Sequence, residues 1–210
     1  AAAYKLASSG VVTYMGIPNQ KPLVSLICEL VLLSFRTGFS HHSLFWMSIL
    51  ASSLAARGKV ALARRIETLT RELAERFGEY PFECGTRINW SIFVQHWYSS
   101  LEGTLKGLVD AYQVGLEHGD LDHLSRAGFA YCTYSYFCGH PLAKFEERRD
   151  VYGPKIAELK QEVPLQYLHL VSEVVSNLRS AEGNTVELSG VYYDEHQDGG
   201  ALVRMRDGFG

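Results

Sequence analysis

The hydrophobic pattern of this chain is interrupted at regular intervals by residues that end helices. These breaks recur about every 20 residues, at Gly38, Gly58, Gly78, Ser99-Ser100, Gly119 and Gly139. Glycine adopts the left-handed conformation that follows a helix, and proline or aspartate suits the first positions of the next helix. The intervals therefore predict helices over 21–37, 41–57, 60–77, 81–98, 101–118, 121–138, 141–160 and 163–179. Gly153-Pro154 predicts a kink or a split in the seventh of these.

Two kinds of segment alternate between the breaks. The segment 60–77 is amphipathic, because its apolar residues step by four, three and four, as one face of a helix requires. Its i,i+4 charge pairs, Glu67–Arg71 and Glu72–Arg76, are interpreted as a solvated outer surface. The segments 44–56, 88–98 and 124–138 are instead apolar nearly all round. Helices of that kind must be covered on several sides.

This alternation predicts an all-α fold. Paired covered and amphipathic helices, with a period of about 40 residues, are typical of an α-solenoid of antiparallel helical hairpins of the tetratricopeptide-like kind. Residues 1–180 are predicted to form this helical repeat domain. Residues 181–210 are rich in glycine and weakly periodic. They are predicted to be a loop or tail that is truncated at residue 210.

Composition and charge limit the partners and the cellular location that we expect for this chain. The net charge is −3 and the isoelectric point is near 6.3, so there is no electrostatic reason to expect nucleic acid or an anionic membrane as a partner. The most apolar run, 23–35, is too short to span a bilayer and contains Glu29. No secretory signal pattern begins the sequence. A cytoplasmic protein without membrane insertion is the expectation.

A long mixed motif covers the middle of the chain. It runs through Ile92-Phe93-Val94-Gln95-His96-Trp97, then Ala111-Tyr112-Gln113-Val114-Gly115-Leu116-Glu117-His118-Gly119-Asp120, then Tyr131-Cys132-Thr133-Tyr134-Ser135-Tyr136-Phe137-Cys138-Gly139. The motif resembles the helical region of large signalling proteins that combine a serine/threonine kinase-like domain, an AAA-type ATPase domain, a GAF domain and a sensor histidine kinase. The resemblance is closest over 90–145 and extends over 20–178. That family carries an arginine where this chain has Gln95.

The resemblance implies a tetratricopeptide-like array between the ATPase and GAF domains, with no chemistry of its own. The sequence also lacks a Gly-x-x-x-x-Gly-Lys-[Ser/Thr] phosphate loop, a His-Arg-Asp kinase loop and an Asp-Phe-Gly motif. We therefore expect a non-catalytic scaffold and relay segment of an ATPase/kinase signalling protein, without a cofactor. The expected partners are neighbouring domains of the same polypeptide, another protein, or a second copy of the chain.

An alternative hypothesis is a sensory module that binds a peptide or small effector in an aromatic-lined groove. The candidate groove or interface residues are Trp90, His96, Trp97, Tyr98, Tyr131 and Tyr134. Exposure of these rings would favour the groove, and burial would favour packing between repeats.

Two clusters of chemically versatile residues are not interpreted as sites. Cys132, Cys138 and His140 have irregular spacing and no fourth ligand, so no metal site is predicted. Asp194, Glu195 and His196 combine carboxylates with an imidazole, as acid–base chemistry requires. They lie in the glycine-rich tail without a rigid scaffold, so no catalytic residue is predicted there.

Overall fold

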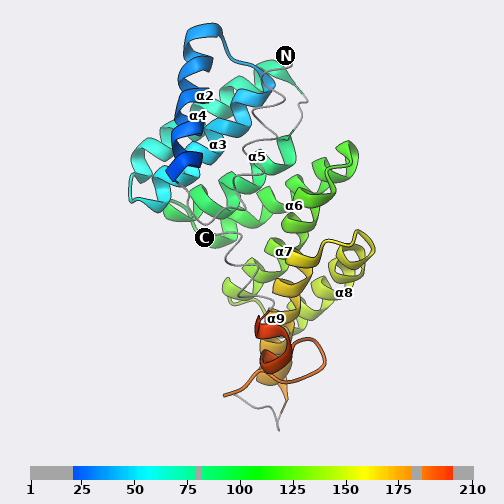
Figure 1. Ribbon diagram of the computed structural model, residues 1–210. Coiled ribbons are helices and arrows are strands. Elements are labelled where there is room, and N and C mark those ends of the chain that lie inside the picture. Colours follow the sequence, from blue (N-terminus) through cyan, green and yellow to red (C-terminus); the bar gives the residue numbers. More distant parts are fainter. Residues whose placement is uncertain (1–20, 79–81, 181–185, 201–210) are drawn as a thin grey trace. The chain divides into compact units, whose positions relative to one another are not determined.

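A computed structural model describes residues 21–78, 82–180 and 186–200. The predicted all-α class is confirmed over these ranges, which contain helices and a single isolated antiparallel bridge between Ser189 and Asp194. The described residues fall into two compact units, which divide between Ser100 and Leu101 (Figure 1). Unit 1 precedes this boundary and unit 2 follows it.

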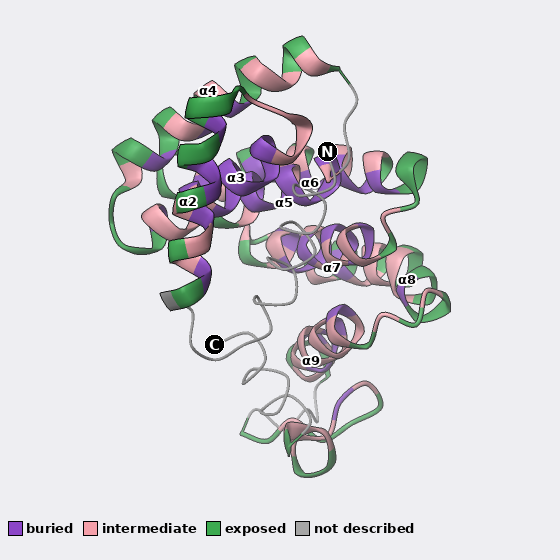
Figure 2. Ribbon diagram, turned by 45° about the horizontal axis from the view of Figure 1, so that its top comes forward, coloured by how far each residue is buried: buried purple, intermediate pink, exposed green. Residues whose placement is uncertain are grey.

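Unit 1 is built around one central helix. Its elements are α2 (Lys21–Thr37), α3 (His41–Ala56), α4 (Val60–Phe77), α5 (Glu83–Asn89), the π-helix η1 (Trp90–Val94) and the 3₁₀-helix η2 (Gln95–Trp97). The central helix, α3, packs against α2, α4, α5 and η1. It is buried continuously from Ser43 to Ile49, as Figure 2 shows. The prediction that this apolar segment is covered on several sides is therefore confirmed.

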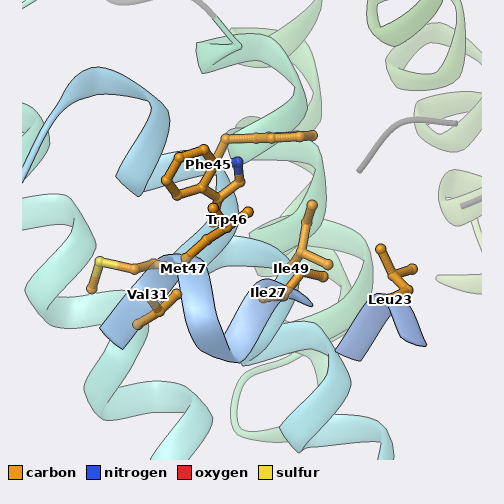
Figure 3. Close-up of a cluster of buried hydrophobic side chains, with 8 residues drawn as sticks. Leu23, Ile27, Val31, Phe45, Trp46, Met47 and Ile49 are labelled. Atoms are coloured by element: carbon orange, nitrogen blue, oxygen red, sulfur yellow. The ribbon is translucent and has the colours of Figure 1, made fainter. Parts of the chain in front are cut away.

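The core of unit 1 lies between α2 and α3. Leu23, Ile27 and Val31 follow one face of α2, and Figure 3 shows them beside Phe45, Trp46, Met47 and Ile49 of α3. Each large apolar side chain that is fully buried stabilises the fold by roughly 1.5–3 kcal/mol. This cluster therefore fixes α2 against the central helix.

Residues 101–179 of unit 2 form four consecutive helices. They are α6 (Leu101–His118), α7 (Leu121–Phe137), α8 (Leu142–Glu158) and α9 (Glu162–Arg179). Each helix packs against the next, and α7 also contacts α9. The buried positions of α7 are mostly small, namely Ser125, Ala127, Gly128, Ala130, Cys132, Thr133 and Ser135 beside Leu124. Small side chains let neighbouring backbones approach closely, which allows one helix to contact three others.

The predicted breaks coincide with the ends of the helices. Gly58 has a φ of 74° after α3, and its N–H donates to the Ala55 carbonyl at 2.9 Å. Asp120 is the N-cap of α7, with its side chain accepting from the His123 N–H at 3.4 Å. Glycine and aspartate are therefore used for the conformations and caps that favoured them in the sequence.

Three sequence predictions are wrong in detail. The segment 81–98 is not one α-helix, because it changes to π and then 3₁₀ geometry after Asn89. Of the kink or split predicted at Gly153-Pro154, the split is wrong, because α8 runs through Pro154 to Glu158 and Ile156 packs in the core after it. Glu67 is not solvated but buried, and its partners are described below.

Residues 186–200 belong to unit 2 and fold against its helices α8 and α9. The prediction of a loop or tail over 181–210 is wrong for residues 195–200, which are helical. The N–H of Tyr192 donates to Glu173 Oε2 at 3.1 Å, and Asn177 Nδ2 donates to the Glu187 carbonyl at 3.4 Å. The Arg149 guanidinium lies 4.6 Å from the centre of the Tyr192 ring. The tail therefore has a defined attachment to α8 and α9 over its described part.

Among the helices of the described residues, none is both long enough and apolar enough to cross a membrane.

Candidate functional site

The most irregular backbone of unit 1 lies at η1 and η2. The N–H of Gln95 bonds to the Trp90 carbonyl, five residues back, which is the spacing of a π-helix. Such π-turns are rare and are frequent at functional sites. We therefore take the surroundings of 90–98 as the candidate functional site.

Glu67 of α4 lies at the centre of this site and is only 3% exposed. Its Oε1 accepts from Nε and Nη2 of Arg71, at 3.0 and 2.9 Å, and from Nε2 of Gln95 at 3.0 Å. Its Oε2 accepts from the Tyr98 hydroxyl. A buried carboxylate is tolerated only when paired and hydrogen-bonded in this way. The bonds from Gln95 and Tyr98 tie α4 to the segment that follows the π-turn, whereas the two from Arg71 lie within α4.

Two arginines of α4 stack on aromatic rings of this segment. The Arg71 guanidinium lies 4.4 Å from the Trp90 ring centre, and that of Arg64 lies 4.9 Å from the Tyr98 ring centre. Seven residues correspond to about two helical turns, so both arginines project from the same flank of α4. Cation–π attraction thus adds to the hydrogen bonds of Glu67.

The environment of Tyr98 holds its phenol in the protonated form. Burial raises the pKa of Tyr98 well above its ordinary value, and the hydrogen bond to Glu67 and its negative charge raise the pKa further. The neighbouring Arg71 and Arg64 lower it only in part. Tyr98 is therefore a hydrogen-bond donor at neutral pH and a poor candidate for a general base.

Hydrogen bonding around the π-turn is incomplete. Trp90 Nε1 and His96 Nδ1 are buried without a partner in the described part of the chain. Leaving a buried donor or acceptor unsatisfied costs about 1–3 kcal/mol. The His96 ring instead packs on Trp97, with centroids 5.1 Å apart. The segment therefore combines irregular backbone with two unsatisfied polar atoms.

The predicted groove residues of unit 1 differ in exposure. Trp90 is buried, whereas Trp97 is 51% exposed and Tyr98 is 37% exposed. Phe93, which the sequence did not single out as a candidate site residue, is 48% exposed. An exposed aromatic pair, Phe93 and Trp97, thus projects from the π-turn region.

The other two predicted groove residues lie in α7 of unit 2. Tyr131 is half-buried, with the Arg148 guanidinium 4.9 Å from its ring centre and the Tyr152 ring edge-on at 5.6 Å. Tyr134 is also half-buried, and burial raises its pKa. The six candidates therefore belong to two separate units.

Glu67 and Gln95 are the site residues that sequence reasoning missed. The i,i+4 pair Glu67–Arg71 was interpreted as solvated because the pattern is typical of exposed helix surfaces. A signal was present nonetheless, since Glu67 shares a helix face with the small buried residues Ala63 and Thr70. A carboxylate within a line of small residues can be enclosed by a neighbouring element.

Of the residues considered as metal ligands, Cys132 and His140 have separate roles. Cys132 lies in the core of unit 2, and burial raises the pKa of its thiol to about 12. His140 Nε2 lies 2.8 Å from Glu102 Oε2, and Arg148 Nη1 donates to His140 Nδ1 at 2.8 Å. Since Arg148 occupies the lone pair of Nδ1, Nε2 carries the proton that Glu102 accepts. The imidazole thereby links the start of α6 to α8.

A second group of ligand types lies on the tail. One ligand atom from each of Glu187, Glu195 and His196 lies within 4.8 Å of the others. All three are at the surface, where acidic groups often cluster without a metal. The geometry alone therefore assigns no metal to them.

Comparisons with protein-family models, with curated proteins and with solved structures find no match to this chain.

Proposed function

We propose that this chain is a non-catalytic helical-repeat scaffold, a tetratricopeptide-like relay segment of a larger kinase and ATPase signalling protein. It would contact neighbouring domains of the same polypeptide or another protein. The helix spacing supports the repeat, since α6 and α8 begin at Leu101 and Leu142, and α7 and α9 at Leu121 and Glu162. Each pair of starts is one period of about 40 residues apart, as in stacked hairpins.

The observation that carries the proposal is the two-sided apolar surface of α2. One side packs on α3, while Leu32, Leu33 and Phe35 are exposed. Helices at the free end of a repeat stack need a polar outer face, and exposed apolar groups that lie together mark contact surfaces. The outer side of α2 is therefore suited to a further protein element.

The Glu67 cluster supports the non-catalytic part of the proposal. The carboxylate already accepts four hydrogen bonds, and Tyr98 is held protonated. A general base needs an available lone pair and a pKa near the working pH. The cluster fits a role in fixing the end of unit 1.

Site-specific photocrosslinking tests the scaffold role. A benzophenone amino acid would replace Leu33 in the natural full-length protein in cells, with exposed Thr68 of α4 as the matched control position. Adducts from Leu33 to another domain of the same polypeptide, or to one defined protein, are expected. Phe35→Asp should remove them without changing the helical circular dichroism. Equal labelling from Leu33 and Thr68 would contradict the proposal.

The sensory module is a second candidate, favoured by one observation. Among the described residues Trp90 Nε1 is a buried donor without a partner, and the exposed Trp97 follows seven positions later in the same irregular segment. An effector at this site would shield Trp97 from acrylamide, while buried Trp46 and Trp90 would be unaffected. A peptide and small-molecule screen read by this quenching tests the idea. Compounds that protect the wild-type chain but not Trp97→Phe would support it, and a screen without such compounds would count against it.

A further inference from the structure

Charge is distributed unequally along the chain. Residues 1–100 contain ten Lys and Arg against six Asp and Glu, whereas residues 101–210 contain ten against seventeen. The first half therefore carries +4 and the second half −7, which together give the net −3. Surfaces of opposite charge steer association between protein molecules.

The positive charge of unit 1 gathers at the turn between α3 and α4. The basic surface consists of Arg57, Lys59, Arg64 and Arg65, and no Asp or Glu occurs between residues 30 and 66. Within the described ranges none of the four forms an ion pair, although Arg57 Nη1 donates to the Ser53 carbonyl at 2.8 Å and Arg64 stacks on Tyr98.

Two features strengthen this basic surface as a contact site. The first turn of α4 holds no acidic residue and Lys59 is its N-cap, so the positive end of the helix dipole adds to the potential. Leu62 is exposed among the cations. Figure 2 shows that α4 is largely exposed or partly exposed along its length. The surface thus combines an apolar contact with positive charge.

The matching negative surface is on unit 2. The acidic turn, residues 186–198, contains Glu187, Asp194, Glu195 and Asp198 and has no Lys or Arg. Val191, within this turn, is 95% exposed. The acidic turn thus also places an exposed apolar side chain among like charges.

The acidic turn is held in one conformation. Ser189 and Asp194 pair across the bridge, Gly190 N–H donates to the Tyr193 carbonyl at 3.1 Å, and Glu173 accepts from Tyr192. Asp194 Oδ1 accepts from the N–H groups of His196 and Gln197, at 2.9 and 3.2 Å. A surface ordered before binding loses less entropy on association.

We propose that the basic surface of one copy binds the acidic turn of a second copy. This rests on the proposed scaffold function and names its partner. Each surface combines an exposed apolar residue, Leu62 or Val191, with charged residues close to it in the sequence, and the charges of the two surfaces are opposite. An acidic protein segment fits the basic surface better than nucleic acid does, because only four cations gather there on a chain of net negative charge.

Sedimentation velocity of the whole chain tests the pairing. Association that depends on protein concentration is expected in 50 mM NaCl, weaker by about 10-fold or more in 300 mM NaCl because salt screens surface charges. Arg65→Glu should weaken it by about 10-fold at low salt. Arg76→Glu is the matched control, since Arg76 is also exposed on α4 but lies about three turns from Arg65.

A charge exchange identifies the acidic turn as the partner. Glu195→Arg alone should weaken association as Arg65→Glu does. An equimolar mixture of the two variants should restore it, because the unaltered basic surface of Glu195→Arg meets the unaltered acidic turn of Arg65→Glu. Circular dichroism of each variant should match that of the wild type, so that loss of folding is not mistaken for loss of binding.

Several results would overturn the pairing. They are a monomer at every concentration, an effect of Arg76→Glu equal to that of Arg65→Glu, or a mixture that fails to associate. Binding of single-stranded RNA or of phosphatidylserine vesicles by a monomeric chain, lost in Arg65→Glu, would assign the basic surface to that ligand instead. Crosslinking from Leu33 reports on a different face, so the scaffold proposal can survive the failure of this one.

Discussion

At the scale of single residues, the buried Glu67 carboxylate makes a sharp prediction. Glu67→Gln removes the charge that Arg71 and Tyr98 need, so the free energy of unfolding should fall by about 1–3 kcal/mol. The lower end of this range is expected because Arg71 is partly exposed and solvent weakens its ion pair with Glu67. Urea unfolding at pH 7 measures the change. Glu72→Gln, an exposed carboxylate on the same helix, should change stability by less than about 0.5 kcal/mol. Equal effects of the two variants would mean that the Glu67 network contributes nothing.

Gly190 is predicted to be irreplaceable for a steric reason. A Cβ atom at this position would lie 2.1 Å from Glu173 Oε1 and 2.5 Å from its carboxyl carbon. Glu173 is itself 2% exposed and cannot easily move away. Gly190→Ala should therefore release the acidic turn. Hydrogen exchange at the Tyr192 amide should then accelerate by about 10-fold or more, because losing one hydrogen bond of about 1.4 kcal/mol corresponds to a factor of about 10. In Gly199→Ala, where the nearest atom is Tyr193 Oη at 3.7 Å, exchange should be unchanged.

Sequence patterns predicted the environment of a residue correctly where apolar residues are buried, but not where a charged residue is buried. The apolar residues of α3 are buried as expected, because such side chains have no other favourable place. Glu67 could not be placed, because an i,i+4 ion pair looks the same whether a neighbouring segment covers it or not. The cover comes from Gln95 and Tyr98, which are 28 and 31 residues further along the chain. Contacts at that separation depend on tertiary packing and leave no local signal.

At the scale of elements, the N-cap residue of α7, Asp120, predicts that stability depends on pH. Burial alone would raise the pKa of Asp120, but the hydrogen bond and charge of the His123 ring and the His123 N–H lower it below its ordinary value. A carboxyl whose pKa is lowered by folding stabilises the fold above its unfolded pKa, near 4, and this contribution is lost as the pH falls below that value.

The prediction is tested by the difference between wild type and Asp120→Asn. The two should differ in unfolding free energy at pH 7, and the difference should shrink as the pH falls below about 4. Asp120→Ala should cost about 1 kcal/mol at pH 7, because the cap itself is lost. Asp122→Asn, which changes a more exposed carboxylate, is the control for general charge effects. A wild-type advantage that persists at pH 3 would show that the Asp120 charge is not involved.

The π-turn predicts an unusual tolerance to deletion. A π-turn accommodates one residue more than an α-helix, so removing exposed Phe93 should return 90–97 to α-helical geometry with both flanks kept in register. Removing Thr68 from the regular helix α4 should instead rotate every later residue by about 100°, the angle per residue of a helix with 3.6 residues per turn. Thermal unfolding followed by circular dichroism should show a smaller loss of stability for the Phe93 deletion. The reverse order would contradict the assignment.

The helices themselves were largely predictable, and their irregularities were not. Starts and ends agree within about two residues outside 81–98, because glycine, proline and aspartate act locally at helix ends. The π-turn escaped prediction because Trp90 to Val94 have an apolar pattern that suits either geometry. The choice is made by contacts with α3 and α4, which local propensity does not contain.

At the scale of the whole molecule, the chain combines separate cores with separated charge. The buried cluster of Leu23, Ile27, Phe45 and their neighbours lies wholly in unit 1, and that of Phe145, Ile156 and Leu168 lies wholly in unit 2. The regular spacing of helix-ending residues predicted one helical repeat domain over residues 1–180. The division at Ser100 and Leu101 follows directly after the irregular segment that Glu67 holds in place.

Separate cores predict that stability can be lowered in one unit at a time. Leu44 and Leu168 are fully buried, and changing either to Ala should cost about 2–5 kcal/mol in its own core. Hydrogen exchange resolved by peptide should then show faster exchange across 21–98 in Leu44→Ala and across 101–179 in Leu168→Ala, with the other range unchanged. Each variant is the matched control for the other, since both remove the same atoms from a helix. Loss of protection across both ranges in either variant would mean that the units unfold as one cooperative block, as strongly coupled repeats do.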